Sequence, residues 1–144
     1  MKTIDVTGHA DAPPEAVYAL LADGETWPDW APFDAFEVTE PGDENRLGEV
    51  HVFRFGRYAT RERIVELVPG RRYSYELLEG LPLRDYRADV DLADDGAGGT
   101  RIHWHSTFAP ARPGTGWIYR AYLTRFITRC VNGLAEHAAT ITSA

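Results

Sequence analysis

Hydrophobic and polar residues alternate along most of the middle of the chain. In residues 71–79, Tyr73, Tyr75 and Leu77 occupy every second position, and charged or polar residues stand between them. A period of two with one apolar side is typical of antiparallel strands whose sheet has one packed and one wet face. Turn-forming residues separate the strands that this pattern predicts, at 3–9, 35–40, 47–55, 57–68, 71–79, 84–93 and 100–109.

Two other parts of the chain follow a helical period. Pro13 and Pro14 suit the first turn of a helix that apolar spacing extends to about Gly24, and residues 27–30 predict a second short helix or turn. Thr115 can cap a helix that runs to about residue 141, which at 1.5 Å per residue is roughly 38 Å long. Its apolar stripe consists of Tyr119, Leu123, Phe126, Ile127, Cys130, Leu134 and Ala138.

The order of these elements predicts an α+β fold. A strand and two short helices come first, then a run of antiparallel strands, then one long helix. A sheet with one apolar face must cover it, and the long helix is the element with the length to do so. We therefore expect one domain over residues 1–144, with a space between sheet and helix that side chains or a ligand fill.

Composition and charge narrow the expected partners. Acidic residues outnumber basic ones by 22 to 15, which gives a formal charge of −7 and argues against a nucleic-acid partner. The single cysteine, Cys130, predicts neither an internal disulfide nor a thiolate metal site. The absence of a long apolar stretch predicts no membrane span and no signal peptide, so a cytoplasmic location is expected.

Several short motifs occur in an order that is typical of a known family. They are Ala12-Pro-Pro-Glu-Ala-Val17, Leu20-Leu-Ala-Asp23, Trp27-Pro-Asp-Trp30, Arg63-Ile-Val-Glu66, Pro69-Gly-Arg-Arg-Tyr73 and Gly98-Gly-Thr-Arg101 before Trp104. Together they resemble the START/Bet v1-like (SRPBCC) superfamily, in its polyketide cyclase/dehydrase branch. The resemblance implies a helix-grip fold, in which a curved antiparallel sheet of about seven strands wraps a long C-terminal helix around a deep, largely apolar cavity. Lipid carriers, hormone and allergen-type binders and aromatase/cyclases share this fold, so it does not settle function.

One histidine and one glutamate form a candidate catalytic pair. A two-residue turn at Gly56 and Arg57 would place His51 opposite Glu62 on neighbouring strands, both pointing toward the packed side. A buried carboxylate beside an imidazole can fix its tautomer and raise its basicity for acid–base chemistry. A register slip of one residue would instead send both side chains to the wet face, and a bulge near Glu66 is a further alternative.

Two further histidines alternate on a late strand. His103 and His105 could both ligate a metal, but Ile102 and Trp104 are expected to occupy the packed face of that strand. The histidines should therefore point outward and pair with Asp89 and Asp91 of the neighbouring strand, and no metal site is expected.

Large apolar and aromatic side chains are predicted to line the space between sheet and helix. A buried tyrosine hydroxyl usually has a hydrogen-bond partner. Several tyrosines on one packed face therefore suit an aromatic or oxygenated ligand, whereas a plain aliphatic core would not need them. The predicted ligand-binding residues are Trp30, Phe33, Phe53, Tyr58, Ile64, Tyr73, Tyr75, Tyr86, Trp104, Leu123 and Phe126.

Three functions fit these observations. The first is binding of a hydrophobic or aromatic small molecule, such as a lipid, a polyketide or another secondary metabolite. The alternative is a polyketide cyclase, aromatase or dehydrase that uses acid–base groups in the cavity, and a third is a protein-binding or chaperone-like module with an exposed apolar patch. No cofactor is expected, and the pattern allows either a monomer or a homodimer.

Overall fold

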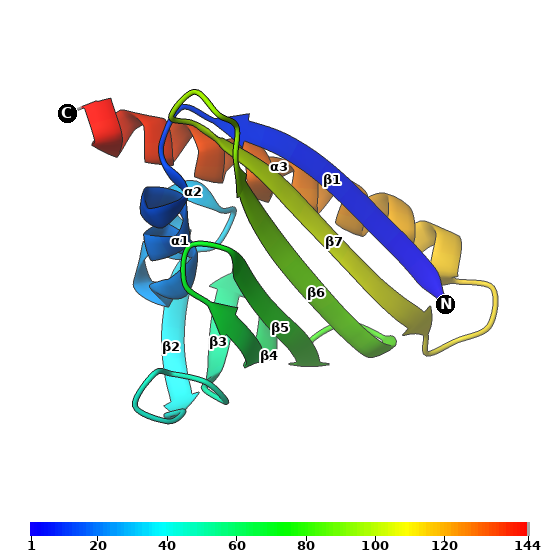
Figure 1. The fold of residues 1–144 in the computed structure, drawn as a ribbon. Coiled ribbons are helices and arrows are strands. Elements are labelled where there is room, and N and C mark those ends of the chain that lie inside the picture. The colour runs from blue at the N-terminus through cyan, green and yellow to red at the C-terminus, as the bar shows by residue number, and fades with distance from the viewer. Residues whose placement is uncertain (144) are drawn as a thin grey trace.

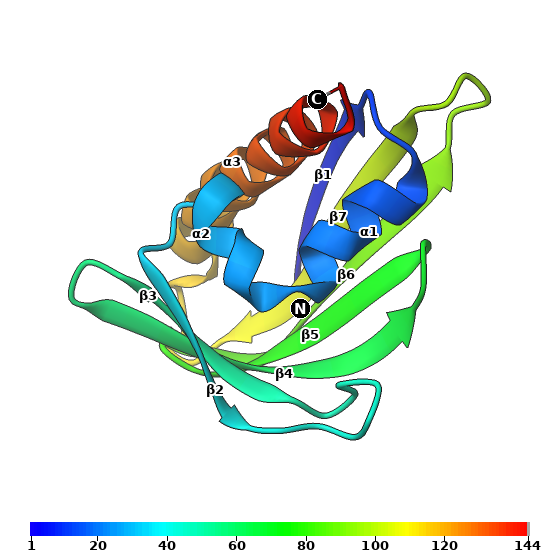
Figure 2. The ribbon, with the colours of Figure 1, turned by 90° about the vertical axis from the view of Figure 1, so that its left-hand side faces the viewer.

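The computed structural model describes residues 1–143, which form a curved antiparallel sheet with helices on its concave side (Figures 1 and 2). The strands and helices are β1 (Lys2–Ala10), α1 (Pro14–Ala22), the 3-10 turn η1 (Gly24–Thr26), α2 (Trp27–Trp30), β2 (Ala35–Glu40), β3 (Val50–Phe55), β4 (Tyr58–Val68), β5 (Arg72–Glu79), β6 (Leu83–Asp94), β7 (Thr100–Pro110) and α3 (Gly116–Ser143).

The seven strands lie in the order β1-β7-β6-β5-β4-β3-β2, and each pairs antiparallel with its neighbours. The first strand of the chain therefore pairs with the last, and the remaining strands follow one another as a meander. This confirms the predicted α+β helix-grip architecture, with observed strand ends within three residues of the predicted ones. The largest difference is at β3, which begins at Val50 because the preceding residues turn at Arg46 and Gly48, both with positive φ.

Helix α3 lies against the sheet along β1 and β7, with α1 and α2 packed beside it (Figure 2). Two glycines allow the close approach. A Cβ atom on Gly8 of β1 would collide with Val131 of α3, and one on Gly133 of α3 would collide with the backbone carbonyl oxygen of Trp30. Small residues at both crossings therefore set how closely the helix is gripped.

The core between helices and sheet is unusually aromatic. The ring of Trp27 is fully enclosed, stacks on Phe53 at a centroid distance of 4.8 Å, and meets Trp104 edge-on at 5.8 Å. Its indole N–H donates to the carbonyl oxygen of Leu21, 3.0 Å away, so the polar atom of this core residue has a partner.

Two local details differ from simple strand and helix patterns. The β4–β5 register shifts between Ile64 and Glu66, which sends the Glu66 carboxylate to the outer face, where Arg72 and Arg87 contact it. Thr115 precedes α3, but its hydroxyl donates to the carbonyl oxygen of Arg112 instead of capping the helix. Within residues 1–143, no helix is long and apolar enough to cross a membrane.

Candidate functional site

A small pocket lies between α3 and the concave face of the sheet. Its volume is about 40 Å³, which holds a few water molecules at most, whereas ligand pockets usually measure roughly 300–1,000 Å³. The aromatic rings of the core occupy much of the space that a larger cavity would need. The lining residues are Phe33, Phe55, Thr60, Glu62, Tyr75, Leu77, Leu81, Tyr86, Tyr122, Leu123, Phe126 and Ile127.

An outer groove adjoins this pocket and provides the space that the pocket lacks. The groove has a volume of about 380 Å³ and runs between the β3–β4 hairpin, the β5–β6 loop and the first turns of α3. Phe55, Leu81 and Tyr122 line both the pocket and the groove. These three side chains therefore separate the two spaces, and their rotation would join them.

The inner pocket is apolar except at one end. The Glu62 carboxylate is buried there, and its Oε1 atom has no hydrogen-bond partner. The Thr60 hydroxyl, two residues earlier on the same face of β4, also lacks one. A buried polar group without a partner costs about 1–3 kcal/mol, so these atoms suit a ligand that supplies hydrogen-bond donors.

His51 lies directly behind Glu62. The two residues are opposite one another in the β3–β4 ladder, as the hairpin turn predicted, and Nε2 of His51 is 3.6 Å from Oε1 of Glu62. The imidazole is completely buried and does not line the pocket itself. Any effect of His51 on a ligand would therefore pass through the Glu62 carboxylate.

A second carboxylate holds the other side of the imidazole. Oε2 of Glu49 is 3.0 Å from Nδ1 of His51, and Arg46 binds both carboxylate oxygens of Glu49 at 2.9 Å. Arg46 is fixed in turn by a hydrogen bond to the carbonyl oxygen of Ala22 at the end of α1. A continuous chain of polar groups thus runs from Arg46 through Glu49 and His51 to Glu62.

The surroundings of Glu49 favour its ionised form. Burial acts to raise the pKa of Glu49, but hydrogen bonds from Arg46 and His51 outweigh it and hold that pKa below its ordinary value. An ionised Glu49 accepts a hydrogen bond from Nδ1 of His51 and so holds the imidazole in place, with Nε2 facing Glu62.

Two buried tyrosines, Tyr75 and Tyr86, also line the pocket. Burial raises the pKa of Tyr75 well above its ordinary value and raises the pKa of Tyr86 to about 12. Both phenols stay protonated near neutral pH and line the same pocket as Glu62. They can donate hydrogen bonds to a carbonyl or hydroxyl oxygen of a bound molecule.

The structure divides the residues predicted for the site into three groups. Glu62, Phe33, Tyr75, Tyr86, Leu123 and Phe126 line the inner pocket. Tyr58 lies in the outer groove with 59% of its surface exposed. The remaining residues are buried in the core around the pocket, namely His51, Trp30, Phe53, Ile64, Tyr73 and Trp104.

Glu49 and Arg46 are the site residues that the sequence analysis missed. Glu49 precedes His51 by two positions, so strand alternation itself would have placed it beside the imidazole. Arg46 carried no such signal, because it belongs to a loop and has a φ of 72° that strand or helix periodicity does not predict. Six lining residues of the pocket were also missed, namely Phe55, Thr60, Leu77, Leu81, Tyr122 and Ile127.

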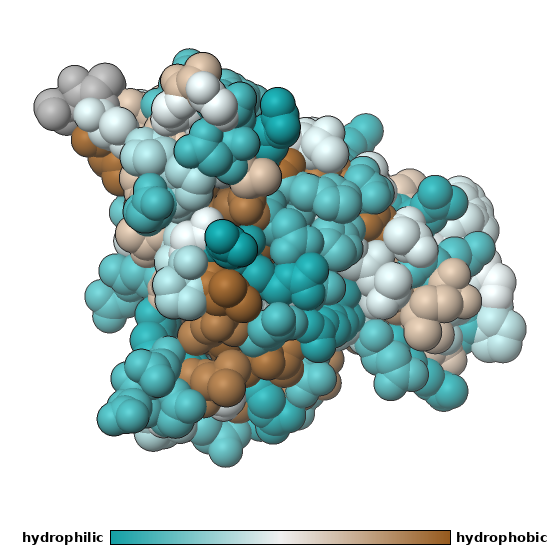
Figure 3. Space-filling model, in the orientation of Figure 1, coloured by the Kyte–Doolittle hydropathy of each residue, from teal (hydrophilic) through white to brown (hydrophobic). Residues whose placement is uncertain are grey.

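The two histidines of β7 lie on the outer face of the sheet, as expected, but with one different partner. Nε2 of His105 is 2.7 Å from Asp91, whereas Nε2 of His103 is 2.9 Å from Asp5 of β1. The predicted partner Asp89 is occupied by Ser74 and Arg87 instead. Most of the surface seen from this side is hydrophilic, with apolar areas confined to separate patches (Figure 3).

Comparison with known proteins places the whole fold in a family. The family described as "Polyketide cyclase / dehydrase and lipid transport" matches residues 1–139. No curated protein matches the chain.

Solved structures of similar shape are numerous. One is the START superfamily protein from Mycobacterium smegmatis, with a TM-score of 0.83 and 11% identity over 96% of this chain and 98% of that one. Another is the protein XoxI from Bacillus cereus, with a TM-score of 0.82, 16% identity and 99% coverage of each chain. A third is the Zhui aromatase/cyclase from Streptomyces sp. R1128, with a TM-score of 0.80 and 18% identity over 95% of this chain and 93% of that one. At these identities the similarity shows the START-like fold alone.

Proposed function

Because the chain belongs to the polyketide cyclase/dehydrase and lipid transport family, we propose that it binds a hydrophobic small molecule that carries at least one hydroxyl or enol group. The apolar part of the molecule occupies the space between α3 and the sheet, and its hydroxyl group donates to Glu62. An aromatic or polyketide-like compound of this kind matches a wall composed mainly of aromatic rings.

The unpartnered Oε1 atom of Glu62 is the observation that carries this proposal. A carboxylate in an apolar pocket, with no cation or donor on that oxygen, is a costly feature for a purely structural core. A ligand hydroxyl would complete its hydrogen bonding, and a charge-assisted bond of that type contributes about 1.5–3 kcal/mol. Neighbouring hydroxyl groups on Thr60, Tyr75 and Tyr86 can orient a second oxygen of the same molecule.

Binding of a ring-sized molecule requires the pocket to enlarge. Phe55 and Tyr122 lie between the pocket and the outer groove, and Tyr122 is 45% exposed, so its ring is free on one side. Movement of these rings would connect the inner volume of about 40 Å³ with the outer volume of about 380 Å³. The combined space falls within the range that small-molecule sites occupy.

A cyclase or dehydrase is the second candidate function, and the chain from Arg46 to Glu62 favours it. The Glu62 carboxylate could remove a proton from the carbon between two carbonyl groups of a poly-β-ketone, with His51 adjusting its basicity. The resulting carbanion would attack a second carbonyl carbon, whose oxygen would take up a proton from Glu62 or a tyrosine. Loss of water would then give the aromatic ring, with the pocket holding the chain in its folded shape.

Native mass spectrometry of the full-length protein, purified from its own host, tests the binding proposal. We expect a bound hydrophobic molecule that departs on denaturation and whose occupancy falls in Glu62→Gln. Glu76→Gln is the matched control, because Glu76 pairs with Arg63 on the wet side of the same sheet. Two results together would contradict the proposal: the purified protein carries no bound molecule, and its tryptophan fluorescence does not respond to phenolic and lipid extracts of the host.

The enzyme candidate has a separate test. A reactive poly-β-ketone thioester is incubated with the wild type, His51→Ala and Glu62→Ala, and the ring-closed products are compared. The enzyme candidate requires that both variants lose the wild-type product pattern. Identical products from all three proteins would eliminate it while leaving the binding proposal intact.

A further inference from the structure

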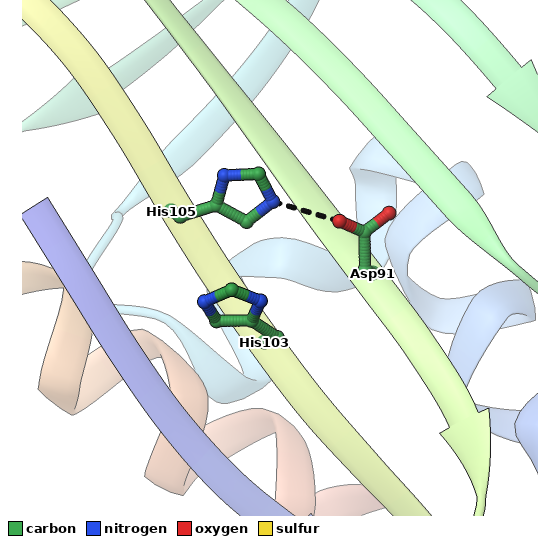
Figure 4. Close-up of side chains that lie close together, drawn as sticks. All are labelled: Asp91, His103 and His105. Carbon is green, nitrogen blue, oxygen red and sulfur yellow. Dashed lines mark hydrogen bonds and ion pairs between the residues drawn. The ribbon is translucent and has the colours of Figure 1, made fainter.

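A compact group of potential metal ligands lies on the convex face of the sheet, away from the pocket. It consists of Asp91 on β6 and of His103 and His105 on β7 (Figure 4). One ligand atom from each residue can be chosen so that all of them lie within 4.8 Å of one another. We propose that Asp91, His103 and His105 form a binding site for a divalent transition-metal ion of the Zn²⁺ type.

The strands hold these side chains in place before any ion arrives. His103 and His105 are two residues apart on one strand, so their rings point to the same side and stack at a centroid distance of 4.4 Å. Asp91 is directly opposite His103 in the β6–β7 ladder, and its carboxylate reaches diagonally to His105 at 2.7 Å. In Figure 4 the two rings and the carboxylate converge above adjacent strands. Ligands on rigid neighbouring strands lose little conformational entropy on binding an ion.

The donor set fits a borderline metal ion. Two imidazoles and one carboxylate are common ligands for Zn²⁺, with water in the remaining coordination position. Bonds of about 2.0–2.1 Å in a tetrahedral site put ligand atoms roughly 3.4 Å apart, a spacing that small rotations of these side chains can reach. The side chains of His103, His105 and Asp91 are 43%, 29% and 32% exposed, so water can approach the ion.

Neighbouring carboxylates and guanidinium groups orient the proposed ligands. Asp5 lies 2.9 Å from Nε2 of His103, which fixes that ring and leaves its Nδ1 atom available to a metal. Arg72 binds both oxygens of Asp91, at 2.6 and 3.0 Å, and so orients the carboxylate with Oδ2 toward His105.

The charges around the site favour a cation although Arg72 contacts Asp91. Contacts link Arg72 and Arg87 to Glu66, Asp89 and Asp91, and Asp5 adjoins through the histidine pair. With Arg101 on the wall of the adjoining hollow, four carboxylates face three guanidinium groups. Carboxylates still outnumber the guanidinium groups, which favours a cation at the site.

An open hollow of about 620 Å³ next to the site gives access from solvent. Asp91 and His103 lie on its wall. Its remaining lining residues are Thr7, Gly8, His9, Leu92, Ala93, Arg101 and Ile102.

Titration of the tag-free, full-length protein with Zn²⁺, against a chromophoric chelator, tests the proposal. We expect saturable one-to-one binding in the wild type and at least about tenfold weaker binding in His103→Gln and in His105→Gln. His137→Gln is the matched control and should bind as the wild type does, because His137 lies on α3, away from these strands. Far-ultraviolet circular dichroism of each variant verifies that it is folded.

A second readout reports on the ligands directly. Replacement of Zn²⁺ by Co²⁺ should give visible absorption bands of a four- or five-coordinate site in the wild type, and these bands should disappear in His103→Gln and His105→Gln. Absence of saturable one-to-one binding would overturn the proposal, as would wild-type affinity in His103→Gln and His105→Gln. Neither result depends on the inner pocket, so the metal site and the proposed function are tested independently of each other.

Discussion

Nε2 of His51 and Oε1 of Glu62 lie 3.6 Å apart across the β3–β4 ladder, and both atoms lack a hydrogen-bond partner. The distance is too long for a hydrogen bond, and the surroundings are too apolar to leave two such atoms unsatisfied without a penalty. One side of this pair adjoins the pocket, and the other side is anchored by Glu49 and Arg46. The arrangement is therefore a strained polar site that a bound molecule can complete.

The first prediction concerns the stability of Glu62→Gln. Glutamine has nearly the same shape but no charge, so it removes a buried carboxylate that has no cationic partner within hydrogen-bond distance. We expect the free energy of unfolding to rise by about 1 kcal/mol while ligand binding weakens. Guanidinium denaturation of both proteins measures the difference, and a loss of stability of similar size would show that Glu62 has a structural role.

The second prediction concerns Arg46→Met. This change leaves the buried Glu49 without its guanidinium partner, and removing one member of a buried ion pair costs about 3 kcal/mol. The matched control is Arg61→Met, whose partners Glu40 and Glu79 are exposed, and which should cost less than about 1 kcal/mol. Urea unfolding of the two variants at neutral pH provides the comparison, and equal losses would contradict a buried role for Arg46.

The same ion pair predicts how stability depends on acid. The pKa of Glu49 is lowered in the folded protein, so its contribution is present above the unfolded value of about 4.3 and is lost as the pH falls through the lower folded value. In Arg46→Met the main cause of that lowering is absent. The acid-induced loss of stability attributable to Glu49 should therefore be smaller in the variant than in the wild type between pH 5 and the acid transition.

A third prediction concerns alkaline pH. Burial raises the pKa of Tyr73, Tyr75 and Tyr86, the last to about 12, above the unfolded value of about 10. A raised folded pKa gives stability that is complete below pH 10 and declines as the pH rises beyond it. Tyr86→Phe should make this decline shallower, as followed by unfolding at several alkaline pH values. The exposed Tyr58→Phe serves as control and should leave the slope unchanged.

A fourth prediction compares an enclosed tryptophan of the core with an exposed tryptophan of α3. Trp27 is enclosed by Phe53, Tyr73 and Trp104, so Trp27→Ala should lower the free energy of unfolding by about 3–5 kcal/mol. Trp117, at the start of α3, is 68% exposed. Trp117→Ala should therefore change the free energy of unfolding by less than about 0.5 kcal/mol. Thermal and denaturant unfolding measure both values, and a large effect of Trp117→Ala would contradict the exposed position of its side chain.

The sequence predicted the fold and part of the site, and the reasons are local. The two-residue turn at Gly56, where φ is 59°, sets the β3–β4 register and so brings His51 opposite Glu62. The bulge between Ile64 and Glu66 is at the place that the sequence analysis named as an alternative, and it shifts the register of the next strand pair without moving Glu62 from the packed side. The small volume of the pocket also escaped prediction, because it depends on how Trp27, Phe33 and Phe53 interlock in three dimensions.

The central claim is that Glu62 anchors the hydroxyl group of a hydrophobic ligand, and a comparison of 2-naphthol with naphthalene tests it most directly. Both are titrated into the wild type, Glu62→Gln and the control Glu76→Gln, and binding is followed by calorimetry or by nuclear magnetic resonance. The account predicts that the wild type and Glu76→Gln prefer 2-naphthol by about tenfold or more, and that Glu62→Gln loses this preference. An equal preference in Glu62→Gln, or no binding of either compound to the wild type, would contradict it.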